Sequence, residues 1–506
     1  MTQGAGSKRP RGWPRLAAAT GSTTRAAGRQ LTEQLGGTQR TRVVVILACV
    51  LGLSGADAAT VGAAATQLRA ALGIGDTGIG LLVTAASLVG AVASLPFGVL
   101  ADRVRRTWTL GGAVAFWGVA MIWSATASSY GELLLARLAL GAVTAASGPV
   151  VASLVGDYFA AGERGRIYGF ILAGEMLGAG FGFAVSGDLA ALSWRASFVA
   201  LAIPAFALAV AVVRMPEPLR GGQGVLPHLT ATSDPADDYE PEPPEQREQR
   251  EPRHHDAQEL AVQLGVRPAQ SRILRTDARK MGLLEATRFV LRLRTNVLLI
   301  ASSACAYYFL AGVQTFGVEF AKDQFGATQA VANVLLLVIG VGAVGGTFSG
   351  GIIGDALLRR GRLKARVTTA AVAATAATLL FVPALLTHSL LAAVPYLMGA
   401  AFFLAGQGPP LDAARLDIVP APLWGRAEAV RTLLRSLAQS LAPLAFGVLS
   451  EHVFGGGPTS LRSTFAVMLV PLAVSAFLLN KARRTYPVDV ATAAAAVPQT
   501  PPPDSR

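Results

Sequence analysis

The stretch GVLADRVRR at residues 98–106 closes one long apolar run, and a degenerate copy, GGIIGDALLRRGR at residues 350–362, closes another. The two aspartates of these stretches, Asp102 and Asp355, lie half a chain apart in a sequence of 506 residues. The apolar runs are long enough to cross a membrane as helices. The repeat therefore predicts two similar helical bundles that are joined by a linker.

Composition supports a chain that crosses the membrane many times. Hydrophobic residues make up 52% of the sequence and charged residues only 15%, with a mean hydropathy of +0.47, whereas a soluble domain carries about a quarter charged residues. The net charge of +13 comes from cations that flank the apolar runs, so it indicates orientation in a membrane and not a nucleic-acid partner. We expect an all-α integral membrane protein in a lipid bilayer.

The apolar runs predict twelve transmembrane helices in two pseudo-symmetric six-helix bundles. Cations concentrate in alternate loops, which places the linker and both termini in the cytoplasm of a plasma-membrane protein. The middle of the linker is polar and proline-rich, so we expect it to be largely disordered, and its end fits an amphipathic helix on the membrane surface. The expected segments are a basic tail at 1–42, bundles at 43–214 and 296–481, the linker at 215–295 and a disordered tail at 482–506.

The stretch at 98–106 resembles the signature loop of the major facilitator superfamily, G-x-L-a-D-r-x-g-R-[RK]. The matching positions are Gly98, Leu100, Asp102, Arg103 and Arg106. The resemblance implies the major facilitator fold, in which this aspartate helps to latch the two halves together on the cytoplasmic side.

Charged residues in the second half suggest a matching part of that inner gate. Glu428, Arg431 and Arg435 are spaced three and four residues apart, hence on one face of a helix. An alternative is that Arg435, the deepest of them, attracts an anionic headgroup. The residues that we expect to act in gating are Asp102, Arg103, Arg106, Asp355, Asp412, Glu428 and Arg431.

A narrower resemblance is to the Spinster-like branch of this superfamily. The similar strings are LGIGDTGIGLLVTAASLVGAVASLPFGVLADRVRR at 72–106, GDYFAAGERGRIYGF at 156–170 and PPLDAARLDIVPAPLWGRAEAV at 409–430. The resemblance implies an amphiphilic substrate such as a lysolipid, proton coupling, and a monomer.

Charged side chains inside the membrane are costly unless they are paired or face a wet cavity, so each one is a functional candidate. Asp57 lies near the middle of the first predicted helix and Glu175 near the middle of the fifth. We predict that both couple transport to protons, with a structural ion pair between Asp57 and Arg137, and a packing role for Glu175, as the alternatives. The residues that we expect to bind substrate are Arg137, Gln314, Gln407 and Arg435.

The resemblance, together with the charges inside the membrane, implies a secondary active transporter that works by alternating access, with proton-coupled export or flipping of a lysolipid-like molecule or a hydrophobic drug. A proton-coupled permease for a small polar solute and a non-transporting membrane receptor are the alternatives, and sodium coupling stays open. None of the five histidines forms a His–acid pair at helical spacing within a bundle, and the sequence has no zinc or phosphate-binding motif. We therefore expect no enzyme activity, no cofactor and no metal site.

Overall fold

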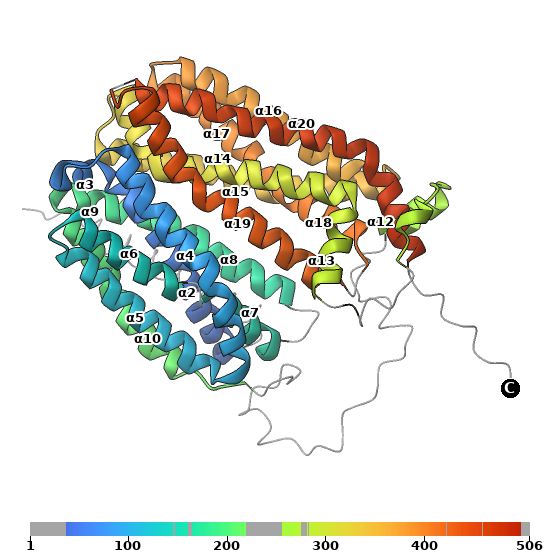
Figure 1. Ribbon diagram of the computed structural model, residues 1–506, viewed down its shortest axis with the longest axis horizontal. Helices are drawn as coiled ribbons and strands as arrows, with labels where there is room; N and C mark the ends of the chain where they lie inside the picture. Colours follow the sequence, from blue (N-terminus) through green and yellow to red (C-terminus); the bar gives the residue numbers. More distant parts are fainter. Residues whose placement is uncertain are drawn as a thin grey trace, which may run out of the picture.

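The computed structural model describes residues 37–144, 147–159, 164–218, 256–274, 281, 283–420, 423–457 and 459–496, and within these ranges some side chains, including those of 94–103, remain undescribed. The regular elements in these ranges are helices, and they form two bundles that lie side by side (Figure 1). The expected all-α architecture is confirmed.

The first bundle, here called the N half, runs from α2 to α10. Its elements are α2 (Thr38–Ala63), α3 (Ala65–Leu72), α4 (Asp76–Arg103), α5 (Arg106–Thr126), α6 (Tyr130–Thr144), α7 (Ser147–Tyr158), α8 (Arg164–Phe181), the π-helical η1 (Gly182–Ser186), α9 (Gly187–Leu192) and α10 (Trp194–Val213).

The second bundle, the C half, runs from α14 to α20. Its elements are α14 (Arg294–Phe325), α15 (Gln329–Arg359), α16 (Ala365–Leu386), α17 (Leu390–Gly406), α18 (Gly408–Ile418), α19 (Trp424–Val448), the π-helical η5 (Leu449–Val453) and α20 (Ser460–Ala495). The linker contributes α12 (Asp256–Gln263), the short η2 (Gln270–Arg272) and α13 (Leu283–Arg292).

Twelve membrane spans account for these elements. In the described part of the chain, ten helical segments are long and apolar enough to cross a bilayer. The other two spans are interrupted helices, namely α6 followed by α7, and α8 continued by η1 and α9. Each half therefore holds six spans, as the sequence repeat predicts.

Glycines bring neighbouring helices of each half into backbone contact. A Cβ atom on Gly178 of α8 would lie 1.9 Å from the carbonyl oxygen of Gly52 on α2, and one on Gly346 of α15 would lie 1.8 Å from that of Phe402 on α17. Lipid gives helices no hydrophobic drive to associate, so close van der Waals packing at small residues holds them together. The glycine-rich composition is explained by these contacts.

The two halves contact each other at one end of the molecule. We call the end that carries the loops at 104–106, 214–218 and 360–364 the linker side, and the opposite end the far side. Helix α4 packs against α19, and α2 packs against α14. In Figure 1 the halves converge near α3, on the far side, and separate toward α7 and α13, on the linker side.

The C-terminal segment differs from expectation. The tail expected to be disordered from residue 482 instead continues α20 to Ala495, and residues 497–506 lie outside the described part. Tyr486 and Asp489 of this extension are fully buried. Tertiary packing explains the difference, because α12 of the linker lies against α20 and its Ala257 and Ala261 join the same apolar cluster.

The C-terminal end of the linker also packs against the C half. Helix α13 contacts α19 and α14, and it buries Ala286 and Val290 while it exposes Leu284 and Leu291. Some of its apolar side chains are thus buried against the C half, and others are exposed on the surface. Residues 237–255, the middle of the linker for which we expect disorder, lie outside the described residues.

Candidate functional site

A cluster of charged side chains joins the halves on the far side. Arg69 of α3 forms an ion pair with Asp76 of its own half at 2.6 Å and another with Glu319 of α14. Glu319 also accepts a hydrogen bond from the hydroxyl of Thr66, and Lys322 lies 3.7 Å from its carboxylate. Because Glu319 is only 2% exposed, its charge depends on these partners.

Further hydrogen bonds between the halves surround this cluster. The backbone N–H of Thr77 donates to Glu451 at 2.9 Å, and the amide of Asn333 donates to Asp188 at 3.1 Å. The side chain of Gln329 donates to a carbonyl of α2 at 2.9 Å. The described hydrogen bonds between the halves thus cluster on the far side, which is closed.

Sequence reasoning did not find this far-side gate. The sequence repeat does contain one indication of this contact. Thr66 and Glu319 lie 253 residues apart, which is the same offset that relates Asp102 to Asp355. The contact therefore joins corresponding positions of the two halves.

On the linker side, Arg106 is the predicted gating residue of the N half whose side chain is described, and it is paired within that half. The side chains of Asp102 and Arg103 lie outside the described part. Arg106, at the start of α5, is buried and forms ion pairs with Asp157 and, at 3.1 Å, with Glu217. Burial alone would raise the pKa of Glu217, but hydrogen bonds from Thr107 and Arg106 outweigh it and lower that pKa.

In the C half the corresponding loop has the same design. Arg366, at the start of α16, lies 2.9 Å from Asp355 and 2.6 Å from the buried Asp417 at the end of α18. The hydroxyl of Tyr486 also donates to Asp417. The two halves thus each use an arginine to tie the start of their third span to the end of their fourth.

The remaining predicted gate residues also pair within the C half. Asp412 binds Arg415 one turn along α18, and Arg431 of α19 lies 3.9 Å from Asp412. Arg431 Nε donates to Glu428 at 2.8 Å. These pairs do not connect the halves, so the linker-side latch that we predicted is not formed among the described residues, which agrees with the separation of the halves there.

Asp57 and Arg137 form a buried pair inside the N half. Arg137 Nη1 lies 2.7 Å from the carboxylate of Asp57, and both side chains are less than a tenth exposed. The Nε of Arg137 is buried without a partner among the described residues. The geometry matches the structural alternative for Asp57, and it leaves one donor of Arg137 free.

Glu175 differs from Asp57 because its carboxylate is accessible. The glycines of α8 turn toward α2, and a Cβ on Gly55 of α2 would lie 2.4 Å from the backbone oxygen of Glu175. The Glu175 side chain is exposed, and no hydrogen-bond partner for it is found among the described residues. It lies within electrostatic reach of Arg435 of α19, which belongs to the other half.

Arg435 is held by an aromatic ring. Its guanidinium lies 4.3 Å from the ring centroid of Tyr307 on α14, a cation–π contact. Its Nε is buried and has no described partner. The ring of Tyr307 thus positions Arg435 on α19, and its Nε is left without an acceptor among the described residues.

The two predicted amides lie elsewhere along the C half. Gln314 is half-buried on α14, where the helix backbone meets Gly62 of α2. Gln407 is buried between α17 and α18 and donates to the carbonyl of Leu404 at 3.0 Å, while its Oε1 has no partner in the described part.

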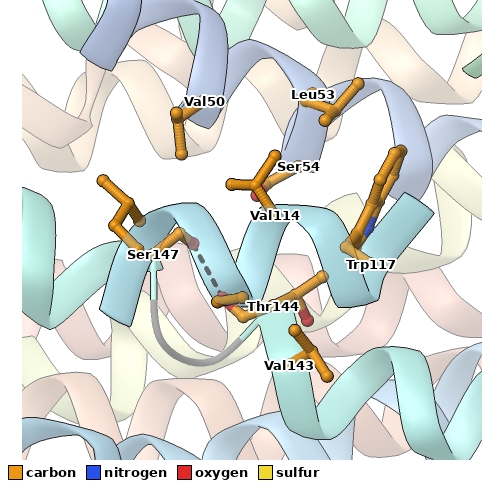
Figure 2. A pocket seen from close by; sticks show the side chains of 10 residues that line it. Val50, Leu53, Ser54, Val114, Trp117, Val143, Thr144 and Ser147 are labelled. Carbon is orange, nitrogen blue, oxygen red and sulfur yellow. Dashed lines mark hydrogen bonds between the residues drawn. The ribbon is translucent and has the colours of Figure 1, made fainter. Parts of the chain in front are cut away.

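A small pocket opens inside the N half between α2, α5, α6 and α7 (Figure 2). Its lining is apolar apart from Ser54, Thr144 and Ser147, and the hydroxyl of Ser147 donates to the carbonyl of Thr144 at 2.7 Å. Asp57, Arg137 and Glu175 are not among its lining residues.

Comparison with known proteins agrees with this fold. The most similar curated proteins include the probable L-galactonate transporter of Escherichia coli (strain K12), 30% identical over 30% of this chain and 34% of that protein. Protein spinster homolog 1 of Homo sapiens is 27% identical over 38% of each chain. The matches thus cover about a third of these relatives.

Two solved structures share the fold over most of the chain. A bacterial homolog of the human lysosomal transporter Spinster, in an inward-facing and unoccupied conformation, has a TM-score of 0.69 at 19% identity and covers 89% of this chain and 98% of its own. The nucleoside transporter NupG (D323A mutant) has a TM-score of 0.61 at 13% identity and covers 88% of this chain and 100% of its own. A family profile matches residues 47–414, and the chain belongs to the Major Facilitator Superfamily.

Proposed function

We propose that this protein is a secondary active transporter that works by alternating access, and that it exports or flips an amphiphilic substrate with proton coupling. The observation that carries the proposal is the asymmetry between the two ends. On the far side the halves are joined through Arg69 and Glu319, whereas on the linker side Arg431 and Arg366 pair within their own half. Rocking of one half against the other exposes a central site to each side in turn.

Orientation follows from the charges. The linker-side loops carry most of the cations next to the spans, such as Arg105, Arg359 and Arg362, and the positive-inside rule places such loops in the cytoplasm. With the linker and both termini in the cytoplasm, the conformation described above is open inward.

The residues between the halves supply the proposed chemistry. Glu175 is accessible and unpaired among the described residues, so it is the proton carrier that we favour, with the paired Asp57 in second place. Arg435 and the free donor of Arg137 suit an anionic group of the substrate. Gln314 and Gln407 are the proposed uncharged contacts.

An amphiphile is favoured by the likeness to spinster homologs and by the apolar composition of the spans. A second candidate is a permease for a small organic anion, because the relatives also include the L-galactonate transporter and the 4-hydroxybenzoate transporter PcaK of Pseudomonas putida. Family membership favours either kind of transport over catalysis.

The test uses purified protein in liposomes with an imposed pH gradient. We would follow a fluorescent lysolipid and radiolabelled 4-hydroxybenzoate in parallel, with Glu175→Gln and Asp57→Asn as variants. Gradient-driven lysolipid movement that Glu175→Gln abolishes is the expected result. Movement of the aromatic anion alone favours the permease, and movement of neither, at rates equal to empty liposomes, contradicts the proposal.

A further inference from the structure

Helix α13 has one face against the C half and an opposite face that is exposed. Ala286, Val290 and the adjoining Leu293 follow one another at spacings of four and three residues, and each is at most 2% exposed. On the opposite face, Leu284 is 66% exposed and Leu291 is 41% exposed. Packing against the C half thus explains the first set of apolar side chains but not the second.

Two arginines share the exposed face with these leucines. Arg288 and Arg292 lie four and eight residues after Leu284, a spacing that places them on the same side of the helix, and both are exposed. Neither forms an ion pair with a carboxylate in the described part of the chain. Arg292 suits the negative end of the helix dipole, but Arg288 lies in the middle of α13, so the dipole does not explain the pair.

Buried hydrogen bonds fix the corner between α13 and α14. The single residue between the two helices, Leu293, has an extended backbone. Asn296 of α14 is 2% exposed, and its side chain donates to the carbonyl of Val290 at 3.1 Å. The backbone N–H of Thr295 donates to the buried Asp489 at 2.9 Å. Helix α13 is therefore held at the linker-side end of α14, beside α19 (Figure 1).

This corner lies where the chain enters the membrane. Helix α14 begins at Arg294 and is long and apolar enough to cross a bilayer, so a helix that ends just before it lies at the level of the lipid headgroups. At that level leucine side chains can enter the boundary of the acyl chains, while arginines remain among the phosphates. Arginines near the end of a span also attract anionic lipids.

We propose that α13 binds the surface of a bilayer that contains anionic phospholipids, with Leu284 and Leu291 inserted below the headgroups and Arg288 and Arg292 bound to the anionic headgroups. This inference goes beyond the proposed function and does not depend on transport. A lipid surface is favoured over the N half as the occupant of this face, because two acids at the linker-side end of the N half are already paired. These acids are Asp157 and Glu217, and both bind Arg106.

The first test measures where the exposed face lies. Spin labels on Leu284→Cys or Leu291→Cys, with Cys49 and Cys305 replaced with alanine, would be compared in liposomes of phosphatidylcholine alone and of an equal mixture with phosphatidylglycerol. With the anionic lipid we expect both labels to become accessible to oxygen and protected from a water-soluble nickel chelate. Val262→Cys is the matched control, because this residue of α12 is apolar and 67% exposed but α12 does not adjoin a span; its label should stay accessible to the chelate.

The second test measures the preference for charge. A bimane fluorophore on Leu291→Cys would be quenched by brominated phosphatidylglycerol or by brominated phosphatidylcholine. Arg288→Gln and Arg292→Gln should each reduce the preference for the anionic lipid about fivefold, whereas Arg288→Lys should retain it. Arg267→Gln is the control of equal charge, because Arg267 is exposed on the loop that follows α12, and it should keep the wild-type preference.

Three results would overturn the inference. Labels at Leu284 and Leu291 that stay as accessible to the chelate as the label at Val262, with or without the anionic lipid, would show that the face lies in water. Labels that are immobilised but reached by neither oxygen nor the chelate would place the face against the N half instead. Equal quenching by the two lipids, unchanged in both glutamine variants, would show that the arginines do not select anionic headgroups.

Discussion

Glu319→Gln is the change that most directly perturbs the closed far side. Glu319 is buried on α14, and it accepts bonds from Arg69 and Thr66 of the other half. Glutamine keeps the shape of the side chain but removes its negative charge, and its amide donates where the carboxylate accepts. Lys322 then also loses the charge that lies 3.7 Å away.

The magnitude follows from the bonds lost. A hydrogen bond to a charged group contributes about 1.5–3 kcal/mol, and the partial exposure of Arg69 (27%) places the loss toward the lower end of that range. The substitution destabilises the far-side-closed conformation, because the hydrogen bond between the halves exists only in that conformation. A loss near the lower end of that range shifts the ratio of far-side-closed to far-side-open molecules by about tenfold.

Distances between spin labels report that ratio. Ala71 in α3 and Thr459 before α20 are exposed far-side positions in different halves, and the native Cys49 and Cys305 can be replaced with alanine. In lipid nanodiscs we expect one distance population for the parent protein and an added, longer one for Glu319→Gln.

Glu132→Gln is the matched control for this experiment. Glu132 is a far-side acid of α6 that bonds only within its own half, accepting from the N–H of Ser128 at 2.9 Å. It should leave the distances unchanged. Identical distance distributions for Glu319→Gln and the parent would refute the claim that this buried cluster holds the far side closed.

Three further changes test the packing and the charges. Arg137→Met leaves the buried Asp57 without its partner and should lower the free energy of unfolding by about 3–5 kcal/mol, measured by denaturation in mild detergent; an unchanged value would show that the pair contributes nothing. Gly178→Leu forces a side chain into the backbone of α2 and should cost at least about 1–3 kcal/mol in the same measurement, whereas Gly112→Leu, with open space around its Cβ, should be tolerated. Because the fold lowers the pKa of Glu217, this group stabilises the protein above its unfolded pKa and loses that effect as pH falls through the folded pKa. Glu217→Gln should therefore lower the melting temperature at pH 7, and the difference should shrink as the pH falls below the ordinary glutamate pKa of about 4.3 and disappear below the folded pKa; a difference of constant size down to strong acid would contradict this assignment.

Much of the fold could be predicted because transmembrane helices can be recognised from their apolar composition and length. Apolar length alone gives the spans, and the repeated loop around Asp102 and Asp355 gives the division into halves. The pairing of Asp57 with Arg137 could also be anticipated, since a buried charge in a membrane needs a partner.

The conformation of the site could not be predicted in the same way. Glu428 and Arg431 were expected to latch the halves, yet they bind each other within α19, because a sequence does not say which end of an alternating structure is closed. Arg69 and Glu319 meet only through tertiary contact between helix ends. The extension of α20 past residue 481 likewise depends on its packing against α12.

The most direct test of the central claim is proton movement triggered by substrate. Purified protein in liposomes that contain a trapped pH indicator would receive lysophosphatidylglycerol on one side without any imposed gradient. We predict a pH change inside the liposomes with wild-type protein and none with Glu175→Gln, although that variant still binds the lipid. A lipid-triggered pH change of equal size in both proteins, or in neither, would contradict the claim that this transporter couples its substrate to protons through Glu175.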